Sequence, residues 1–149
     1  MDVKIFSKRM TELMPKFVRG LARQESNYLV RGKITLPQFW TLEFLSKENG
    51  CCMHKIADFL AITRPAATGL VDRLIAQGLV KRENTPHDRR EVKIDITPKG
   101  KAILSVIVLE KRRTLEKIFS QISPRERKQY LIILERVAGI MQKQPQDKG

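Results

Sequence analysis

The chain of 149 residues contains only two cysteines, and they are neighbours, Cys51 and Cys52. Adjacent cysteines do not make the disulfide framework of a small secreted protein, so we expect a reduced, cytoplasmic setting. No apolar run reaches the roughly 18 residues that a membrane-spanning helix needs. The N-terminus also lacks an apolar segment followed by small residues, so we expect neither an export signal nor a membrane protein.

Catalytic motifs are missing as well. The sequence has no Gly-rich phosphate loop, no Ser/His/Asp set, no Cys/His pair and no carboxylate dyad with supporting context. These absences argue against an enzyme, and we expect a protein that catalyses no reaction and needs no cofactor.

Acidic residues are few relative to basic ones, since 16 Asp and Glu stand against 29 Lys and Arg, for a net charge of +13. Such an excess points to a polyanionic partner, usually nucleic acid and otherwise a membrane surface. The excess is spread along the chain: residues 1–33 carry 8 basic and 3 acidic side chains, and residues 102–149 carry 10 and 5. Charge alone therefore indicates the class of partner but not the binding face.

The most informative segment is residues 52–97, where two helical patterns meet at a tight break and a hairpin pattern follows. The expected elements are helices at residues 54–60 and 63–77, a strand at 79–83, a turn at 84–90 and a strand at 92–96. This order is typical of a winged helix-turn-helix, which places its second helix in the major groove of double-stranded DNA.

Apolar spacing predicts how these two helices pack. The first should bury Ile56, Phe59 and Leu60, and Thr63 should cap the second, with Pro65 tolerated in its first turn. The inner stripe of the second helix is expected to consist of Ile62, Ala67, Leu70, Val71 and Leu74.

The outer face of the second helix is small and polar in its first half. Arg64 could reach O6 and N7 of a guanine, and Thr68 could touch a thymine methyl group or a phosphate. A merely solvated helix face would carry long Glu and Lys side chains, whereas this one offers an Arg, a Pro, a Thr and a Gly. The composition favours entry into the groove.

The wing should begin after Gly78, which supplies the left-handed residue that ends the second helix. An arginine at the wing tip, Arg89 or Arg90, can insert into the minor groove, where the negative potential is greatest over narrow A·T-rich stretches. Asp88 would be repelled by phosphates as a DNA contact, so we interpret it as a group that orients an arginine.

Helical patterns flank this segment on both sides. An apolar face runs along residues 5–28 with Pro15 inside it, and Thr35 and Gln38 form a capping box that opens a helix ending near residues 49–50. A long helix should cover residues 99–121, and its first half is apolar enough to be buried on several sides.

Ser123 and Glu126 form a second capping box, which opens a last helix rich in apolar residues. The apolar surface at both termini exceeds the need of one small domain and predicts a homodimer. The expected fold class is mainly α with a small β-hairpin wing (α+β). Residues 1–34 and 99–149 would be dimerisation helices, and residues 35–98 the winged helix-turn-helix region.

Three motifs lie in order along the chain. Residues 34–39 (Ile-Thr-Leu-Pro-Gln-Phe) open one helix, and residues 74–82 (Leu-Ile-Ala-Gln-Gly-Leu-Val-Lys-Arg) lead into the wing. Residues 88–90 (Asp-Arg-Arg) precede residues 94–100 (Ile-Asp-Ile-Thr-Pro-Lys-Gly). Each is weak alone, but in this order and at this spacing they resemble the MarR family of bacterial and archaeal transcription regulators.

The resemblance implies a two-fold dimer that represses transcription from an inverted-repeat operator, with the fourth helices in successive major grooves and the wings in flanking minor grooves. By position, Arg90 would be the minor-groove arginine with Asp88 as its orienting partner, and Arg89 the alternative. Arg73 would contact phosphate. The DNA-binding set implied in full is Thr63, Arg64, Pro65, Thr68, Arg73, Asp88, Arg89 and Arg90.

The family also binds small phenolic or other lipophilic effectors between its first, second and fifth helices, which shifts the spacing of the two recognition helices. The candidate pocket residues are Phe17, Phe39, Trp40 and Phe44, for which plain core packing is the alternative. One departure from the family is Gly69, which stands where many relatives have a longer polar or basic residue.

Two further hypotheses stay open. One is a sequence-tolerant basic protein that compacts DNA or binds RNA, as the charge suggests. The other is a redox- or metal-responsive regulator that uses Cys51 and Cys52. No metal site is expected, because Cys51, Cys52 and His54 lack the spacing that closes a tetrahedral site. The peroxide-sensing branch of the family has its cysteine near the N-terminus, where this chain has none.

Overall fold

The structure, a computed structural model, describes residues 1–24, 33–85 and 88–143, with side chains at 1–24, 33–84 and 92–143. Two compact units make up the chain, Met1–Lys111 and Arg112–Gly149. The described elements are α1 (Val3–Ala22), α3 (Leu36–Glu48), β1 (Cys51–Cys52), α4 (Met53–Leu60), α5 (Arg64–Ala76), β2 (Val80–Thr85), β3 (Asp88–Ile96), α6 (Pro98–Phe119) and α7 (Pro124–Lys143). The fold class inferred from the sequence, mainly helical with a small antiparallel sheet, is confirmed.

The first helix, α1, has an apolar face but no buried residue. Phe6 and Leu13 are about half exposed, and Pro15 lies in the interior of the helix. Residues 25–28, the end of the apolar pattern in the sequence, lie outside the described residues.

The capping box predicted for α3 is present. The Thr35 hydroxyl oxygen accepts from the backbone N–H of Gln38 at 3.4 Å, and the Gln38 side-chain oxygen accepts from the backbone N–H of Thr35 at 2.9 Å. Asn49 and Gly50, both with positive φ, end the helix as the sequence predicted.

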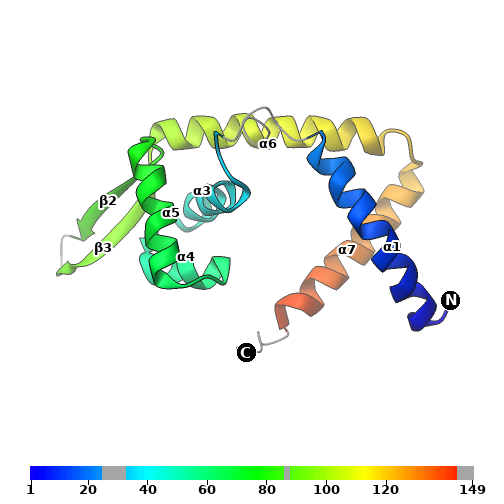
Figure 1. Cartoon of the computed structure of the whole chain (residues 1–149). Coiled ribbons are helices and arrows are strands. Elements are labelled where there is room, and N and C mark those ends of the chain that lie inside the picture. The colour runs from blue at the N-terminus through cyan, green and yellow to red at the C-terminus, as the bar shows by residue number, and fades with distance from the viewer. Residues whose placement is uncertain (25–32, 86–87, 144–149) are drawn as a thin grey trace. The chain divides into compact units, whose positions relative to one another are not determined.

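The core of the first unit lies between α3, α4, α5, the sheet and the first half of α6 (Figure 1). Its buried apolar residues are Ile34, Phe39, Leu42, Leu45, Cys51, Ile56, Val71, Leu74, Leu79, Val80, Ile94, Ile96, Leu104 and Ile107. Leu104 and Ile107 come from α6, so the helix-turn-helix packs on the start of a helix that the sequence pattern assigned to dimerisation. The predicted division at residues 98 and 99 stays a prediction.

The sheet has three antiparallel strands in the order β1-β3-β2. The two-residue β1 lies between two helices and pairs Cys51 with Ile94 and Cys52 with Lys93. The hairpin is longer than predicted, because β2 and β3 continue through Thr85 and from Asp88 into the segment expected to be a turn. A register shift lies between Asn84 and Thr85.

Two burial predictions around the helix-turn-helix are wrong. Phe59 was expected in the core but is 49% exposed, because it stacks on the Phe44 ring at 4.3 Å between centroids, on the outside of α4. Ile62 was expected in the inner stripe but is 37% exposed, because it lies in the turn before α5 begins. Ile56 and Ala57 are buried.

Helix α6 buries one stripe in this single chain, not several sides as predicted. Only Gly100, Leu104 and Ile107 are buried in it, while Val106 and Leu109 are about half exposed. Gly100 touches the start of β2 so closely that a Cβ there would lie 2.1 Å from the carbonyl oxygen of Leu79.

In the second unit, the capping box of α7 is present. The Ser123 hydroxyl accepts from the Glu126 N–H at 3.3 Å, and the Glu126 carboxylate accepts from the Ser123 N–H at 2.9 Å. The Ser123 hydroxyl also donates to the Glu126 carboxylate at 2.6 Å, and this bond, followed by the one from the Ser123 N–H, holds the pKa of Glu126 below its ordinary value. Helix α7 has no buried residue, and its exposed large apolar side chains are Tyr130, Leu131, Ile132, Ile133, Leu134, Val137, Ile140 and Met141.

Candidate nucleic-acid interface

Helix α5 begins at a tight turn that presents its N-terminal end to solvent. Ala61 ends α4 in the left-handed region at φ 53°, and Thr63 then caps α5, its hydroxyl oxygen accepting from the Ala66 N–H at 3.3 Å. Arg64 and Pro65 follow in the first turn, and both are exposed. The predicted cap and Pro position are thus confirmed, and Arg64 stands at the leading end of the helix.

The middle of the outer α5 face offers little polar chemistry. The Thr68 hydroxyl donates to the Arg64 carbonyl oxygen at 3.0 Å, which leaves its methyl group as the part available to a thymine. A Cβ added to Gly69 would meet no atom within 4 Å. Contacts to bases from this face would therefore come mainly from Arg64, and the role of Thr68 stays a prediction.

Two arginines on α5 form no ion pair with the described residues. Arg64 and Arg73 are exposed, and neither has an ion-pair partner among the residues that the structure describes. Asp72, between them on the outer side, is paired instead: its Oδ1 accepts from Nη2 of Arg82 on β2 at 2.6 Å. Sequence inspection missed this pair, because nothing in the pattern of α5 or β2 indicates that the two side chains meet.

The hairpin register explains why Arg82 faces α5. Directly opposite residues of an antiparallel pair project to the same side, and Arg82 is opposite Ile94, which is buried. Arg82 therefore lies on the inner face of the hairpin, and Asp72 of α5 meets it there.

The outer face of the hairpin neutralises its own charge. Lys81 pairs with Glu83 two residues along the strand, and across the strands Lys81 is opposite Asp95 while Glu83 is opposite Lys93. The hydrogen bond that the Lys81 ammonium donates to the Glu83 carboxylate raises the pKa of Lys81. Two cations alternate with two anions, so this face is a poor place for phosphate.

The predicted wing-tip residues lie in β3, but their side chains fall outside the described part of the chain. Asp88 pairs with Thr85 in the backbone register of the hairpin end, and Arg89 and Arg90 follow it in the strand. The roles predicted for Asp88, Arg89 and Arg90 stay predictions.

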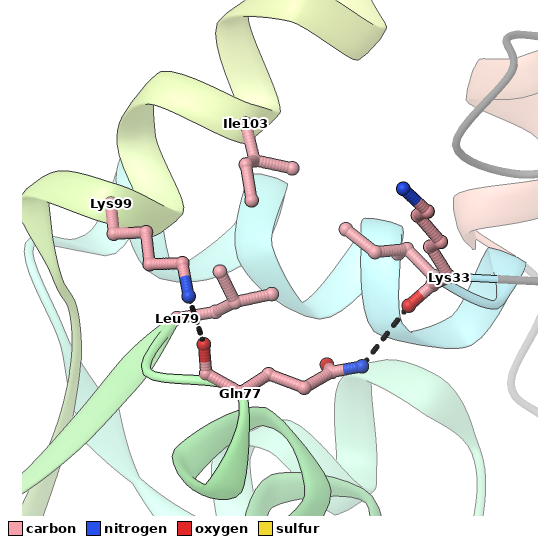
Figure 2. A pocket seen from close by; sticks show the side chains of 6 residues that line it. Lys33, Gln77, Leu79, Lys99 and Ile103 are labelled. Atoms are coloured by element: carbon pink, nitrogen blue, oxygen red, sulfur yellow. Dashed lines mark hydrogen bonds between the residues drawn. The ribbon is translucent and has the colours of Figure 1, made fainter.

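The C-terminal end of α5 is tied to the beginning of α6 and to the segment before α3. The Gln77 carbonyl oxygen accepts from Nζ of Lys99 at 2.9 Å, and the Gln77 side-chain amide donates to the Lys33 carbonyl oxygen at 3.0 Å (Figure 2). The Thr97 hydroxyl donates to the Gly78 carbonyl oxygen at 2.6 Å and accepts from the Gly100 N–H at 3.1 Å. These bonds fix the end of α5 against its support.

The same junction forms a pocket of about 250 Å³ that is open to solvent (Figure 2). Its walls are mostly apolar, with a lysine on two sides. The lining residues are Lys33, Ile34, Gln77, Leu79, Lys99 and Ile103. None of the four effector residues proposed from the sequence lines it.

Those four residues have different surroundings. Phe39 is 6% exposed and belongs to the core, with Nζ of Lys111 lying 5.3 Å from its ring centroid. Phe44 stacks on Phe59, while Trp40 and Phe17 are 43% and 42% exposed. An effector site at these residues stays a prediction.

The two cysteines differ in environment. Cys51 is buried in β1, and burial, followed by the neighbouring Cys52, raises its pKa to about 11. Cys52 is partly exposed, with its Sγ 3.6 Å from Nε2 of His54. Within the described residues, no three His, Cys, Asp or Glu side chains come close enough to hold a metal ion.

Thiol labelling should separate the two cysteines. At pH 8, Cys51 is a neutral, buried thiol, because that pH lies well below its pKa of about 11, and the thiolate is the reactive form. We therefore expect iodoacetamide to modify Cys52 in the folded protein and Cys51 only after unfolding, as measured by mass spectrometry of peptides. Fast labelling of both would contradict the burial of Cys51.

Raising the pH should also weaken the fold through Cys51. The unfolded chain loses this proton near the ordinary pKa of 9.0, whereas the folded chain keeps it to about 11. The contribution of the buried thiol to stability is therefore complete below pH 9 and is lost as the pH rises to about 11.

No helix in the described part of the chain is long and apolar enough to cross a membrane.

Comparison with known proteins agrees with this architecture. Residues 33–91 match the sequence model of the MarR family. The chain is 28% identical over 93 residues to YsmB, an HTH-type transcriptional regulator of Bacillus subtilis. The aligned segment covers 62% of this chain and 64% of YsmB. It is 30% identical over 98 residues to the HTH-type transcriptional repressor YetL of Bacillus subtilis, covering 66% of this chain and 53% of YetL.

The aligned part thus spans less than two thirds of either relative. In structure, the chain resembles a MarR family protein from Bacillus stearothermophilus with a TM-score of 0.84 at 23% identity, over 96% of this chain and 100% of that one. That likeness is one of fold, and the family match falls on the α3-to-wing segment that carries the candidate interface. By its winged helix-turn-helix domain, this chain belongs to the MarR family.

Proposed function

We propose that this protein is a transcription regulator that binds double-stranded DNA in a sequence-specific manner, as a homodimer on an inverted-repeat operator, and represses transcription. The observation that carries the proposal is the exposed leading end of α5, where Arg64 is flanked by small side chains and has no ion-pair partner among the described residues. A helix of this form, next to a hairpin, fits a major groove about 12 Å wide. We call α5 the recognition helix.

The names of relatives support the regulatory class over an enzyme. YsmB is named a transcriptional regulator and YetL a repressor, and repression is proposed here on that likeness.

Exposed apolar side chains support the homodimer. Helix α1 leaves Phe6, Leu13 and Phe17 about half exposed, and α7 leaves a longer set exposed. Contiguous apolar surface on a folded chain is normally covered by a partner, and a second copy is the partner that an inverted-repeat operator requires.

Regulation by a small lipophilic or phenolic effector is proposed on the family resemblance alone. Trp40, the single tryptophan of the chain, would report such binding by fluorescence.

Selection of bound duplexes from a random pool tests the whole proposal. We expect enrichment of an inverted repeat with its two half-sites about one helical turn apart, and a complex that contains two chains by light scattering. The second candidate, a sequence-tolerant DNA binder, is favoured by the net charge of +13. It predicts a steep salt dependence with no enriched sequence, and that result would replace the first proposal.

Replacing Arg90 with alanine tests the wing. If Arg90 inserts into the minor groove, Arg90→Ala should weaken operator binding by about 1–3 kcal/mol, measured by fluorescence anisotropy. Arg89→Ala is the matched control, because it removes the same charge from the neighbouring position. Unchanged affinity for Arg90→Ala would refute this assignment, and a loss confined to Arg89→Ala would move the role to Arg89.

A further inference from the structure

We propose that the ion pair between Asp72 and Arg82 positions the wing against the recognition helix and thereby sets the preference for the sequence that flanks each half-site. The inference rests on the proposed function. Asp72 and Arg82 are positioning residues in this account, since they would act through the placement of the wing tip.

The pair lies where the core of the hairpin ends. Along the inner face of the hairpin, Val80 and Ile94 are 2% and 1% exposed, whereas the next opposed pair beyond Arg82 and Ile94 is Asn84 and Val92, and both are exposed. Apolar packing therefore holds the hairpin up to Ile94. At the position of Ile94 along the hairpin, the 2.6 Å hydrogen bond from Arg82 to Asp72 joins β2 to the recognition helix.

Charge also favours a positioning role. A carboxylate on the outer side of a recognition helix would be repelled by phosphates unless a cation neutralised it, and Arg82 does so here. Arg64 and Arg73, which the proposed function assigns to DNA, are left unpaired among the described residues, whereas Arg82 is committed to Asp72. A short hydrogen bond between two ionised groups also fixes the relative orientation of the two side chains more strongly than a hydrogen bond between neutral groups would.

The position of the pair makes a small movement matter. From Arg82 to the end of β2 at Thr85 the strand extends roughly 10 Å, at about 3.3 Å per residue. The minor groove is only about 6 Å wide, so a change of angle at Arg82 would move the tip away from it. The main effect is expected on binding of flanking DNA, because both side chains are half exposed and exposed pairs contribute little to folding.

Selection from random duplexes with variants of the pair provides the test. Wild type should enrich a half-site core together with A·T-rich flanks. Arg82→Gln and Asp72→Asn should keep the core and lose flank preference by roughly threefold to fivefold, the upper part of the range for exposed pairs. The exchange Asp72→Arg with Arg82→Asp should restore at least half of that loss.

Lys81→Gln is the matched control, since it breaks the ion pair with Glu83 on the opposite face of the same strand. It should leave flank preference unchanged. If Arg82→Gln loses flank preference while Asp72→Asn keeps or strengthens it, Arg82 contacts DNA directly and the inference is overturned. An equal loss of flank preference in Lys81→Gln would also overturn the inference, because the preference would then depend on the charge of the hairpin and not on the Asp72–Arg82 pair.

Hydrogen exchange of the free protein tests the positioning without DNA. Amides of the hairpin beyond Arg82 should exchange about threefold to fivefold faster in Arg82→Gln and in Asp72→Asn, and at the wild-type rate in Lys81→Gln. Unchanged exchange in both pair variants would refute the positioning role. Accelerated exchange in a protein whose wild type enriches no sequence would support the positioning and reject the proposed function instead.

Discussion

Replacing Gly100 with alanine is expected to destabilise the fold by about 3 kcal/mol, because a side chain does not fit where α6 meets β2. An added Cβ would lie 2.1 Å from the Leu79 carbonyl oxygen and 2.8 Å from Cγ1 of Ile96, and the first of these is backbone that cannot rotate away. The helix start must move, and the Gly100 N–H to Thr97 hydroxyl bond would move with it. Urea unfolding at a fixed protein concentration measures the loss of stability.

Gly69→Ala is the control, because the same change is made on a helix where nothing lies within 4 Å of the new atom. Alanine in a helix interior is favoured over glycine by about 0.5–1 kcal/mol, so this variant should gain stability by that amount. A stable Gly100→Ala protein would show that α6 and β2 approach less closely than the structure has them.

Replacing Arg64 with alanine is expected to produce a large loss of operator affinity. A bidentate arginine contact to guanine is worth about 1–3 kcal/mol, and a two-fold dimer would lose it in both half-sites. The loss should be confined to operators with the matching base pair, so Arg64→Ala should also relax specificity there. Anisotropy titrations against the selected operator and against duplexes changed at each position would measure both effects.

Arg73→Ala provides the comparison on the same helix. A bond to phosphate carries no sequence information, so this variant should weaken binding to all duplexes alike and reduce the salt slope by about 1 for each phosphate that is no longer neutralised. If Arg64→Ala behaves in that uniform way instead, then Arg64 also binds the DNA backbone and the bases are read elsewhere.

Features that depend on a few neighbouring residues could be predicted from the sequence. The capping boxes at Thr35 and Ser123, the cap at Thr63 and the left-handed Gly78 all follow from hydrogen bonds within one turn of chain. The order of helices, turn and hairpin follows from periodicity in the same local way, which is why the fold class was correct.

Features that depend on contacts between distant elements could not be predicted. The Asp72–Arg82 pair and the close approach of Gly100 to Leu79 each join two elements, and a charge pattern or a single glycine does not specify its partner. Phe59 was placed in the core because its spacing fits an apolar face, but its ring is 49% exposed and stacks on Phe44.

Gly69 has a consequence for how the specificity of this protein can change over time. The middle of its recognition helix holds a position where an added Cβ would meet no atom within 4 Å. Most substitutions that create a new contact to a base destabilise the protein that carries them. Here nearly any side chain other than proline improves the helix while it reaches toward DNA. Under the proposed function, preference for a new operator can therefore arise at this site by a single substitution, without a second one to restore the fold.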